Sequence, residues 1–299
     1  FVDFEDSYKT MDSTYMESVW WALKETWKKG LIYEGRKVLL YCPRCETPIS
    51  NFEVAMDNSY KDVTEESVIV KFKVVDPAAH KLPENTFILS WTTTPWTLPG
   101  NVALAVGAEI TYMIIQQGDE SYVLAKDRLE VGKGEYEIVA EIKGKKLEGI
   151  AYEPLFDISA VVATGKRAYY VATADFVTVA DGTGVVHTAV MYGEDDYNLG
   201  VRVDLPMVPL LDQQGVFNMS APEFVRGVYF KDAEKAIKKD LIARGILFDK
   251  FPHTHSYPFC HRCDTALFYN AIPAWFINIQ KIKKNLIARN EDISWYPEH

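Results

Sequence analysis

One stretch of the chain is unusually rich in hydroxyl groups. Residues 91–101 contain four threonines, two tryptophans and two prolines, and they follow a strand-like run at 86–90. Each proline fixes its own φ angle and disfavours helical backbone in the residue before it. We therefore expect a stiff, extended turn that is neither a regular helix nor a plain strand. Because hydroxyls both donate and accept hydrogen bonds, such a turn suits a ligand with many sugar and carbonyl oxygens. The alternative is a threonine-rich strand end whose hydroxyls face solvent.

A second polar stretch places glycines before a histidine and a group of carboxylates. Residues 181–189 are expected to form a glycine turn that leads into a short buried strand, and the glycines would let backbone approach a ligand closely. Residues 193–197 are expected to open a short helix. The adjacent carboxylates Asp195 and Asp196 could hold an ammonium group or a metal ion. They could also simply cap that helix, which is a common role of aspartate.

The four cysteines of the chain form two Cys-x-x-Cys pairs. Cys42 and Cys45 make the first pair, Cys260 and Cys263 make the second, and 214 residues separate the pairs. Because no secretion signal precedes them, metal binding is favoured over disulfides. Two such pairs supply the four thiolates of a tetrahedral zinc site, and a full set of protein ligands leaves no position for a catalytic water. The pattern therefore predicts a structural zinc that ties together the two ends of a large insertion.

Two histidines, His255 and His261, lie close to the second cysteine pair and are alternative ligands. A rival interpretation makes each cysteine pair a separate redox motif. Neither pair lies in the βαβ context of a thioredoxin-like site, so this interpretation is less favoured.

The composition of the chain limits the kinds of protein it can be. The 299 residues are 48% hydrophobic and 13% aromatic, enough for one large or two ordinary domains with a packed core. The net charge of −10 argues against general nucleic-acid binding through bulk charge. No apolar run could span a membrane and no signal peptide opens the chain, so a cytoplasmic location is expected. The sequence begins in mid-pattern at Phe1, and we interpret it as a piece of a longer protein.

The elements that would position the polar residues follow from the periodicity of the sequence. Helices are expected at residues 12–29, 231–244 and 279–290, because apolar residues recur there every three or four positions. On the first helix, Trp20 and Trp21 are expected to pack in a core. On the second helix, the lysine-rich face is expected to be solvated.

Short apolar or alternating runs predict many strands, separated by turns that contain glycine, aspartate and lysine. Such a series is typical of a barrel or a curved mixed sheet. The expected strands lie at residues 68–74, 86–90, 102–106, 112–115, 121–124, 136–139, 161–163, 169–171 and 185–189.

Four segments, taken together and in order, resemble one family. Residues 12–53 contain a Val-Trp-Trp motif and the first cysteine pair, and residues 91–101 contain the threonine-rich turn. Residues 181–197 contain the histidine and the carboxylates, and residues 255–276 the second cysteine pair. This set resembles the isoleucyl-tRNA synthetases over nearly the whole chain. The class I enzymes for valine and leucine are less similar, because they usually have an arginine after the paired threonines, where this chain has Thr94.

The signatures of the ATP-using catalytic domain of this family, His-x-Gly-His and Lys-Met-Ser-Lys-Ser, do not occur in the sequence. The resemblance therefore implies the editing domain, an insertion called connective peptide 1, with flanking stem segments and no ATP site. The implied fold is mixed α/β and β-rich: a barrel-like editing domain with peripheral helices and a zinc stem built on the four cysteines. The implied boundaries are an N-terminal stem at 1–55, the editing domain at 56–250 and a return stem at 251–299.

The activity implied by the resemblance is hydrolysis of the valine ester in valyl-tRNA(Ile) that was made in error. Valine is isoleucine without one methylene, and a hydrophobic pocket discriminates poorly against a smaller analogue. Isoleucine enzymes are the standard example of this poor discrimination. A second site, which hydrolyses the products of the smaller amino acid, corrects the error.

The resemblance also implies roles for single residues, with Asp196, His187, Thr93 and Thr94 as the catalytic set. Asp196 would bind the α-ammonium group of the misattached valine and so orient the ester. His187 would limit the pocket so that isoleucine is excluded, although a histidine there could instead be a general base. Hydroxyls, backbone and the ribose of the tRNA would then position the water. The residues implied to hold the terminal adenosine, the ester oxygens and the substrate are Trp91, Thr92, Thr97, Asn101, Gly184 and Val186.

One segment departs from the family pattern. Many members have a proline after the His-Thr-Ala run, whereas this chain has Val190, followed by Met191 and Tyr192. These residues are expected to reshape the floor of the pocket and the degree of valine selectivity, and to leave the ammonium site unchanged.

The implied partners are the 3′ end of tRNA(Ile) carrying valine and the catalytic domain of the parent synthetase. No membrane partner is expected, and the isolated fragment is expected to be monomeric and to bind tRNA weakly, because it is acidic. Two other functions stay open: a zinc-tied tRNA-binding module without hydrolysis, and an editing enzyme for another small aminoacyl-tRNA.

Overall fold

The computed structural model describes residues 7–55 and 59–296. The chain divides into a larger unit, residues 38–271, and a smaller unit made of the segments that precede and follow it. The two polar stretches and all four cysteines belong to the larger unit.

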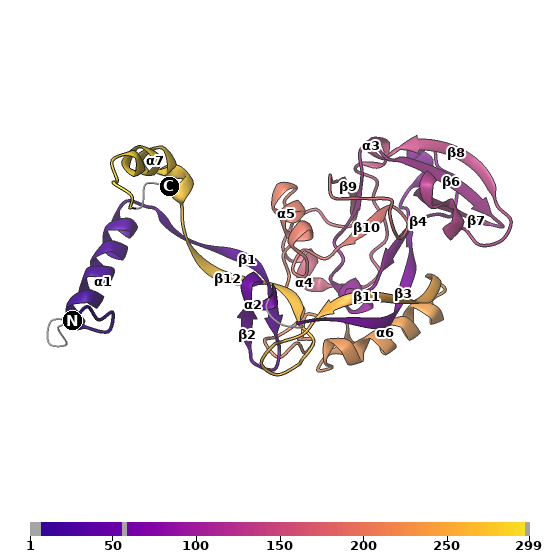
Figure 1. Cartoon of the computed structure of the whole chain (residues 1–299). Coiled ribbons are helices and arrows are strands. Elements are labelled where there is room, and N and C mark those ends of the chain that lie inside the picture. The colour runs from indigo at the N-terminus through magenta and orange to yellow at the C-terminus, as the bar shows by residue number, and fades with distance from the viewer. Residues whose placement is uncertain (1–6, 56–58, 297–299) are drawn as a thin grey trace. The chain divides into compact units, whose positions relative to one another are not determined.

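One curved sheet forms the framework of the larger unit (Figure 1). In the part of the chain that the structure describes, it has nine strands, and seven of them follow the order β8-β6-β7-β4-β10-β5-β9. β3 pairs with β4, and β11 pairs with β3. The strands are β3 (Tyr60–Lys73), β4 (Thr86–Thr92), β5 (Ala103–Val106), β6 (Thr111–Gln117), β7 (Glu120–Ala125), β8 (Glu137–Lys143), β9 (Tyr170–Thr173), β10 (Val185–Thr188) and β11 (Leu247–Pro258).

Strand β4 is the branching point of this sheet. It pairs antiparallel with β3, parallel with β7 through its first three residues, and parallel with β10 at Trp91. Both faces of the sheet are covered here, because four consecutive residues of β3, 67–70, are all buried. This burial on both faces explains why the sequence shows a continuous apolar run there instead of strict alternation.

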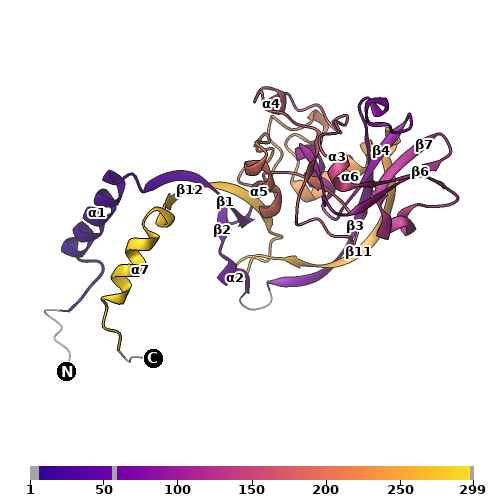
Figure 2. The same cartoon turned by 90° about the horizontal axis from the view of Figure 1, so that it is seen from above.

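Two long strands form a ribbon that leads into the sheet. β3 and β11 pair antiparallel along almost their full length, from Val70 opposite Leu247 to Tyr60 opposite Pro258 (Figures 1 and 2). β11 was not predicted, because its alternating residues are histidines, serine and threonine as well as aromatic rings, and its two prolines are unusual in strands.

A second, three-stranded sheet has the order β12-β1-β2. Its strands also went unpredicted, although the apolar run at 38–40 belongs to one of them. They are β1 (Ile32–Cys42), β2 (Thr47–Ile49) and β12 (Phe268–Ile277), and the short helix α2 (Asn51–Ala55) follows β2.

Helix α6 (Phe230–Ala243) packs against the threonine-rich segment. Ala233, Ile237 and Leu241 on its inner face have 0% exposure, as the periodicity predicted, and so does Phe230, which precedes the predicted range. The prediction that its lysines are solvated is wrong for Lys231, which forms an ion pair with Glu65 of β3 at 2.6 Å. Lys238 likewise pairs with the neighbouring Glu66. The carboxylates of the adjacent strand attract these lysines inward.

Two local predictions are wrong for reasons of backbone geometry. Residues 161–163 do not form a strand, because the short helix α4 (Ser159–Val162) ends there and the valines find no strand to pair with. The proline-rich segment is not an extended turn. After β4 ends at Thr92, residues Pro95–Gly100 form the 3₁₀ helix η2. Pro95 occupies the first turn, where its fixed φ and missing N–H are tolerated.

The larger unit has five further short helices among the described residues. They are the 3₁₀ helices η1 (Pro77–His80), η3 (Lys126–Val131) and η4 (Glu223–Val225), and the α-helices α3 (Gly144–Leu147) and α5 (Glu194–Arg202). Among the described residues, no helix has both the length and the apolar character needed to cross a membrane.

The smaller unit contains α1 (Ser13–Lys28), η5 (Ile279–Lys281) and α7 (Lys283–Glu291). The prediction that Trp20 and Trp21 pack in a core is wrong, because they are 70% and 66% exposed and α1 has no buried residue. Within the described chain, the helix meets little apolar surface; Trp27, whose ring lies 5.9 Å from that of Trp275, is one contact.

Gly184, just before β10, provides a test of this framework. Its φ is +72°, and a Cβ atom there would lie 2.3 Å from Cβ of Ala125. Gly118 has a similar φ of +62° with open space around it. We expect Gly118→Ala to cost about 1–3 kcal/mol through backbone strain alone. Gly184→Ala should cost about 1–3 kcal/mol more, because the core must also shift. Thermal unfolding of both variants measures the difference, and equal losses would contradict the close packing at Gly184.

Candidate active site and metal centre

A cavity of about 270 Å³ lies where β4, η2, β10 and α5 meet. Eight of the ten residues predicted for the active site line it: Trp91, Thr92, Thr93, Thr94, Thr97, Val186, His187 and Asp196. Ala189 and Tyr192 complete the lining. The polar stretches around residues 91–101 and 181–197 therefore form one site.

The threonine hydroxyls form a connected chain along one wall. Oγ1 of Thr92 and Thr94 lie 3.2 Å apart, and Oγ1 of Thr94 and Thr97 lie 3.3 Å apart. The backbone N–H of Thr94 donates to Thr92 Oγ1, and Thr97 Oγ1 donates to the Thr94 carbonyl at 2.8 Å. Thr93 is different: its hydroxyl has no hydrogen-bond partner among the described residues, so it is free to bind a ligand.

His187 is held as a neutral ring. It is 7% exposed, and burial lowers its pKa from 6.5 to about 4. Its Nε2 lies 2.8 Å from Thr97 Oγ1, and its Nδ1 lies 3.4 Å from the amide nitrogen of Asn101. The Asn101 amide also donates to the Ala103 carbonyl, so its nitrogen side is fixed. His187 Nδ1 is thus the acceptor and Nε2–H the donor.

This arrangement decides what His187 can do. Nδ1 accepts from Asn101, so no free nitrogen is available to take a proton from water. The low pKa also makes the ring a weak base at neutral pH. The geometry therefore favours a shaping role for His187 over general-base catalysis.

Two predicted residues do not line the cavity. Asn101 lies behind His187, where its Oδ1 accepts a hydrogen bond from the buried Tyr152 hydroxyl at 2.7 Å. Gly184 lies at the foot of β10, and its carbonyl accepts from the Tyr112 hydroxyl at 2.7 Å. Both residues support the site from outside the cavity.

Asp196 is a partly buried carboxylate that has no cationic partner among the residues that the structure describes. It lies in the first turn of α5, and its Oδ2 accepts a hydrogen bond from the Ala189 N–H at 2.9 Å. Within the described residues, its other oxygen has no partner, and no lysine or arginine lines the cavity. Burial raises the pKa of Asp196 from 3.8 to about 6, the Ala189 hydrogen bond opposes this shift, and the charge of Asp195 adds to it.

The capping role considered for these carboxylates is wrong. α5 starts after Gly193, and no side chain caps its N-terminus. Asp196 bonds instead to a backbone N–H outside the helix. Its carboxylate therefore lies where a cationic ligand in the cavity could reach it.

The predicted site residues did not include Ala189, and Tyr192 was expected only as part of the segment 190–192 that shapes the pocket floor. Of residues 190–192, only Tyr192 lines this cavity, whereas Val190 and Met191 are buried elsewhere. Oη of Tyr192 accepts hydrogen bonds from the backbone N–H groups of Leu210 and Leu211, which fixes the ring. The signal available in the sequence was the departure from the family pattern at this segment.

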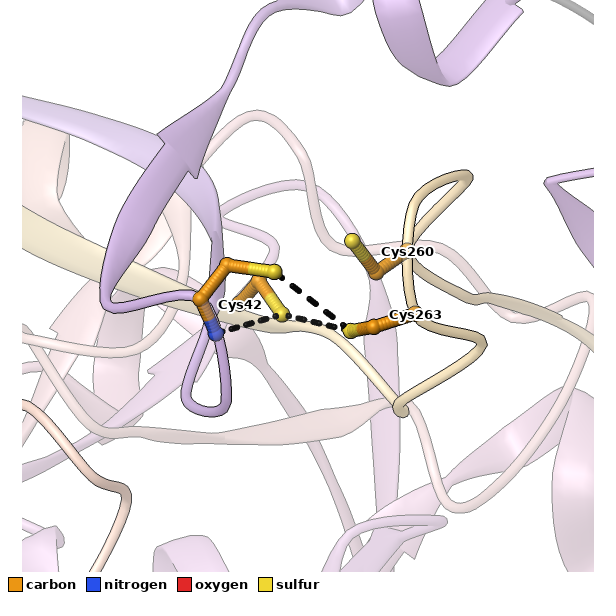
Figure 3. A group of neighbouring side chains, drawn as sticks. Cys42, Cys260 and Cys263 are labelled. Atoms are coloured by element: carbon orange, nitrogen blue, oxygen red, sulfur yellow. Dashed lines mark hydrogen bonds between the residues drawn. The ribbon is translucent and has the colours of Figure 1, made fainter.

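The four cysteines form a compact cluster in the larger unit, and Figure 3 labels Cys42, Cys260 and Cys263 of this cluster. Their sulfurs lie within 4.8 Å of one another, and none is in a disulfide. Sγ of Cys42 and of Cys45 lie 3.4 and 3.5 Å from Sγ of Cys263. Sulfurs around a tetrahedral zinc lie about 3.8 Å apart, as follows from a Zn–S bond of about 2.3 Å. The donor set therefore fits a tetrahedral, thiolate-bound metal ion.

The local geometry of the cluster also matches a metal knuckle. The Cys45 N–H donates to Cys42 Sγ at 3.4 Å, within the turn that follows β1. The alternative ligands His255 and His261 are not in the cluster. They contact Glu65 and Glu53 instead.

Comparison with protein families matches residues 1–299 to the tRNA synthetases of class I (I, L, M and V). The chain therefore belongs to the class I tRNA synthetases. Its relatives include the isoleucine–tRNA ligase of Clostridium acetobutylicum, 46% identical over 298 residues, and that of Treponema denticola, 42% identical over 326 residues. Both alignments cover the whole of this chain. It spans only 28% and 30% of these two relatives.

Among solved structures, the chain resembles the crystal structure of GlLeuRS-CP1, with a TM-score of 0.51 and 13% identity. The match covers 62% of this chain and 99% of that one. At this identity, the likeness concerns the fold alone. The expected fold, a β-rich mixed α/β domain of the connective peptide 1 type with a curled sheet, is confirmed.

The cysteine cluster predicts that metal supports the fold. We expect about one tetrahedrally bound metal ion per chain by elemental analysis, and a strong chelator should lower the Tm by several degrees, because metal binding contributes folding free energy. Cys260→Ser should show the lowered Tm without chelator and respond little to its addition. Elemental analysis shows whether the chelator has removed the metal. If the Tm is unchanged after the metal has been removed, the metal is not structural.

The environment of Asp196 predicts a dependence of stability on pH. Because the pKa is raised to about 6 in the folded chain, folding favours the protonated carboxyl. This residue therefore reduces stability progressively as the pH rises from about 4 to above 6. Asn resembles the protonated form, so Asp196→Asn should have a Tm at pH 8 equal to or above that of the unmodified chain. The two Tm values should converge near pH 4. The quantity to compare is the Tm of the Asn variant minus the Tm of the unmodified chain. If this difference were lower at pH 8 than at pH 4, the prediction would be contradicted.

Proposed function

We propose that this chain is the editing region of an isoleucine–tRNA ligase and hydrolyses the valine ester of valyl-tRNA(Ile). The observation that carries the proposal is Asp196, a carboxylate in a cavity with no cationic partner of its own among the described residues. Keeping such a group partly desolvated costs stability, and a ligand with an ammonium group would relieve that cost. A free α-ammonium group is the feature that every aminoacyl ester carries.

In this proposal, the amine and the sugar bind on opposite walls. The α-ammonium group donates to Asp196, and the terminal adenosine lies along the threonine hydroxyls, with Trp91 and Val186 beside it. Thr93 and Thr94 then face the ester. The free Thr93 hydroxyl can hold either the ester carbonyl or the attacking water.

The chemical step is addition of water to the ester carbonyl. The C–O bond to the ribose breaks, valine leaves as a free amino acid, and the ribose oxygen recovers a hydroxyl proton. Because His187 is neutral and both its nitrogens are occupied, the proposal assigns no general base among the lining residues. Catalysis comes from orienting the ester and the water, which for well-placed groups supplies much of the barrier reduction.

Selectivity in this proposal comes from the space beside His187. Its ring is immobilised by Thr97 and Asn101, so it cannot move aside for a larger side chain. Valine would fit, and the extra methylene of isoleucine would not. Tyr192, which belongs to the segment that departs from the family pattern, sets how strict that limit is.

We further propose that the metal is Zn²⁺, that it is structural, and that it ties residues 1–55 and 251–299 at the base of an editing domain formed by 56–250. The tRNA and the catalytic domain of the parent ligase would be the partners, in the cytoplasm, and the isolated chain would be a monomer. Aminoacylation itself would need an ATP site outside this sequence.

Two other functions compete with this one. A tRNA-binding module that has lost hydrolysis is suggested by the altered segment at 190–192. An editing enzyme for another small aminoacyl group is suggested by the same segment, because Tyr192 lies in the lining. Comparing several mischarged tRNAs separates these from valine editing.

The test is release of the amino acid from valyl-tRNA(Ile) and isoleucyl-tRNA(Ile). The unmodified chain should release valine and spare isoleucine. His187→Ala should release both, because the pocket is larger. Asp196→Asn should slow valine release at least about 30-fold, since loss of a buried charge pair costs about 2–5 kcal/mol. His80→Ala, an exposed histidine outside the cavity, is the control.

If Asp196→Asn released valine at the normal rate, the ammonium site would be wrong. If the chain bound tRNA but released nothing even at high protein concentration, the binding module would be favoured.

A further inference from the structure

A chain of four hydrogen bonds leads from the core to the wall of the cavity. It starts at the hydroxyl of Tyr152, which is not among the residues that line the cavity, and this hydroxyl donates to Asn101 Oδ1 at 2.7 Å. Asn101 Nδ2 lies 3.4 Å from His187 Nδ1, and His187 Nε2 lies 2.8 Å from Thr97 Oγ1. The Thr97 hydroxyl then donates to the Thr94 carbonyl at 2.8 Å.

Every donor in this chain points the same way. The Asn101 amide also donates to the Ala103 carbonyl at 2.9 Å, so both hydrogens of its nitrogen are used and its oxygen faces the tyrosine. His187 Nδ1 accepts from this amide, and its Nε2–H donates. Because the Thr97 proton already goes to a carbonyl, Thr97 Oγ1 accepts from the ring. Hydrogen bonds that are aligned in this way strengthen one another where water is excluded.

Tyr152 is a fixed starting point for this chain. It is 2% exposed, and burial raises its pKa well above the ordinary value of 10, so the hydroxyl keeps its proton. Its backbone N–H donates to the Tyr169 carbonyl at 2.9 Å, and the residue forms a β-bridge with Val74. Its ring lies 5.3 Å from that of Phe72 on β3, with the planes 83° apart. The packing of the core therefore determines where the hydroxyl lies.

We propose that Tyr152 is a positioning residue for the candidate active site: its hydroxyl fixes the Asn101 amide and, through that amide, holds the His187 ring in place at the cavity wall. The inference rests on the proposed function, because His187 limits the size of the substrate side chain in that proposal. Tyr152 itself would touch no substrate, and it would affect selectivity only through these two residues.

Removing the hydroxyl would take away the partner of Asn101 Oδ1, an atom of a side chain that is 3% exposed. A buried acceptor without a partner is unfavourable. The amide cannot correct this by exchanging its oxygen and nitrogen, because the oxygen would then face the Ala103 carbonyl. It must move to reach another donor, so its hydrogen bond to His187 weakens. The ring then keeps its contact with Thr97 and can turn about it, which makes room for a larger side chain.

The first measurement is the ¹⁵N NMR signal of His187 Nδ1 in the full chain, labelled at its histidines. The ¹⁵N shift of an unprotonated ring nitrogen changes when the nitrogen gains or loses a hydrogen bond, so it reports on the contact with Asn101. The signal is assigned by its absence in His187→Ala. Tyr152→Phe, which keeps the ring, should move the signal toward that of a nitrogen without a hydrogen bond, with Nε2 still protonated.

The matched control is Tyr112→Phe. Tyr112 is also fully buried, and its hydroxyl also donates a hydrogen bond of 2.7 Å, in this case to the Gly184 carbonyl. Both variants lose a buried hydroxyl, so both should unfold at a lower temperature than the unmodified chain. Tyr152→Phe should change the His187 signal, whereas Tyr112→Phe should not. Circular dichroism melts establish that each variant is folded.

The second measurement is the release of valine and isoleucine from valyl-tRNA(Ile) and isoleucyl-tRNA(Ile). Tyr152→Phe should raise the rate for isoleucine relative to valine about fivefold, because a hydrogen bond that holds the His187 ring in place is weakened. In a chain that already carries Asn101→Ala, adding Tyr152→Phe should leave this ratio unchanged, since Tyr152 acts through Asn101.

A His187 signal that Tyr152→Phe leaves unchanged would overturn the inference. So would an unchanged release ratio in an active variant, or a further change of the ratio when Asn101 is already alanine. The NMR measurement needs no hydrolysis. A chain that shows the change of signal but releases no valine would therefore contradict the proposed hydrolysis and leave the effect of Tyr152 on His187 in place. Selective release of valine with an unchanged signal would retain the proposed function and overturn the role of Tyr152.

Discussion

The site depends on one strand pairing, the parallel contact between the end of β4 and β10. It joins Trp91 to Val186, and two buried hydroxyls secure it from both sides. Ser90 Oγ donates to the Val185 carbonyl at 2.9 Å, and Thr183 Oγ1 donates to the Leu89 carbonyl at 2.7 Å. A slip of one residue would turn the His187 side chain to the other face of the sheet and away from Thr97 and Asn101. The register therefore keeps His187 in the cavity that the threonines and Asp196 also line.

Burial then sets the chemistry of the cavity. The same desolvation raises the pKa of Asp196 to about 6 and lowers that of His187 to about 4, so it favours the neutral form of both. For His187 this agrees with its hydrogen bonds, which need a neutral ring. For Asp196 it creates a conflict at neutral pH, because the anion has no cationic partner among the described residues of the cavity. Sites commonly retain such unfavourable groups for function at a cost in stability, and our proposal for the bound ammonium group gives this one a purpose.

The cysteine cluster and the long ribbon of β3 and β11 address a different problem. The two cysteine pairs are 214 residues apart in sequence, yet their sulfurs lie within 4.8 Å. Closing so long a segment costs entropy, but the cost rises only slowly with length. A metal at this point would hold both ends of the segment together, and the paired strands would carry that constraint into the main sheet.

The sequence by itself determined much of the local structure and the inventory of chemistry. Apolar runs such as 112–115 and 121–124 form strands, the apolar spacing of 231–244 forms a helix, and the two cysteine pairs form one cluster, because these outcomes follow from short-range pattern and ligand chemistry. Motifs also singled out eight of the residues that line the cavity.

Only the tertiary structure decided the rest. It turned residues 159–162 into a helix, paired the histidine-rich strand β11 with β3, and left Trp20 exposed. It made Asp196 a cavity residue instead of a helix cap, and it placed Asn101 behind His187, which fixes the tautomer of that ring. The reason is physical. Ser90 and Val185 are 95 residues apart in sequence, so the register of their strands depends on tertiary packing. The desolvation of a side chain also depends on the packed arrangement, and no local pattern contains either property.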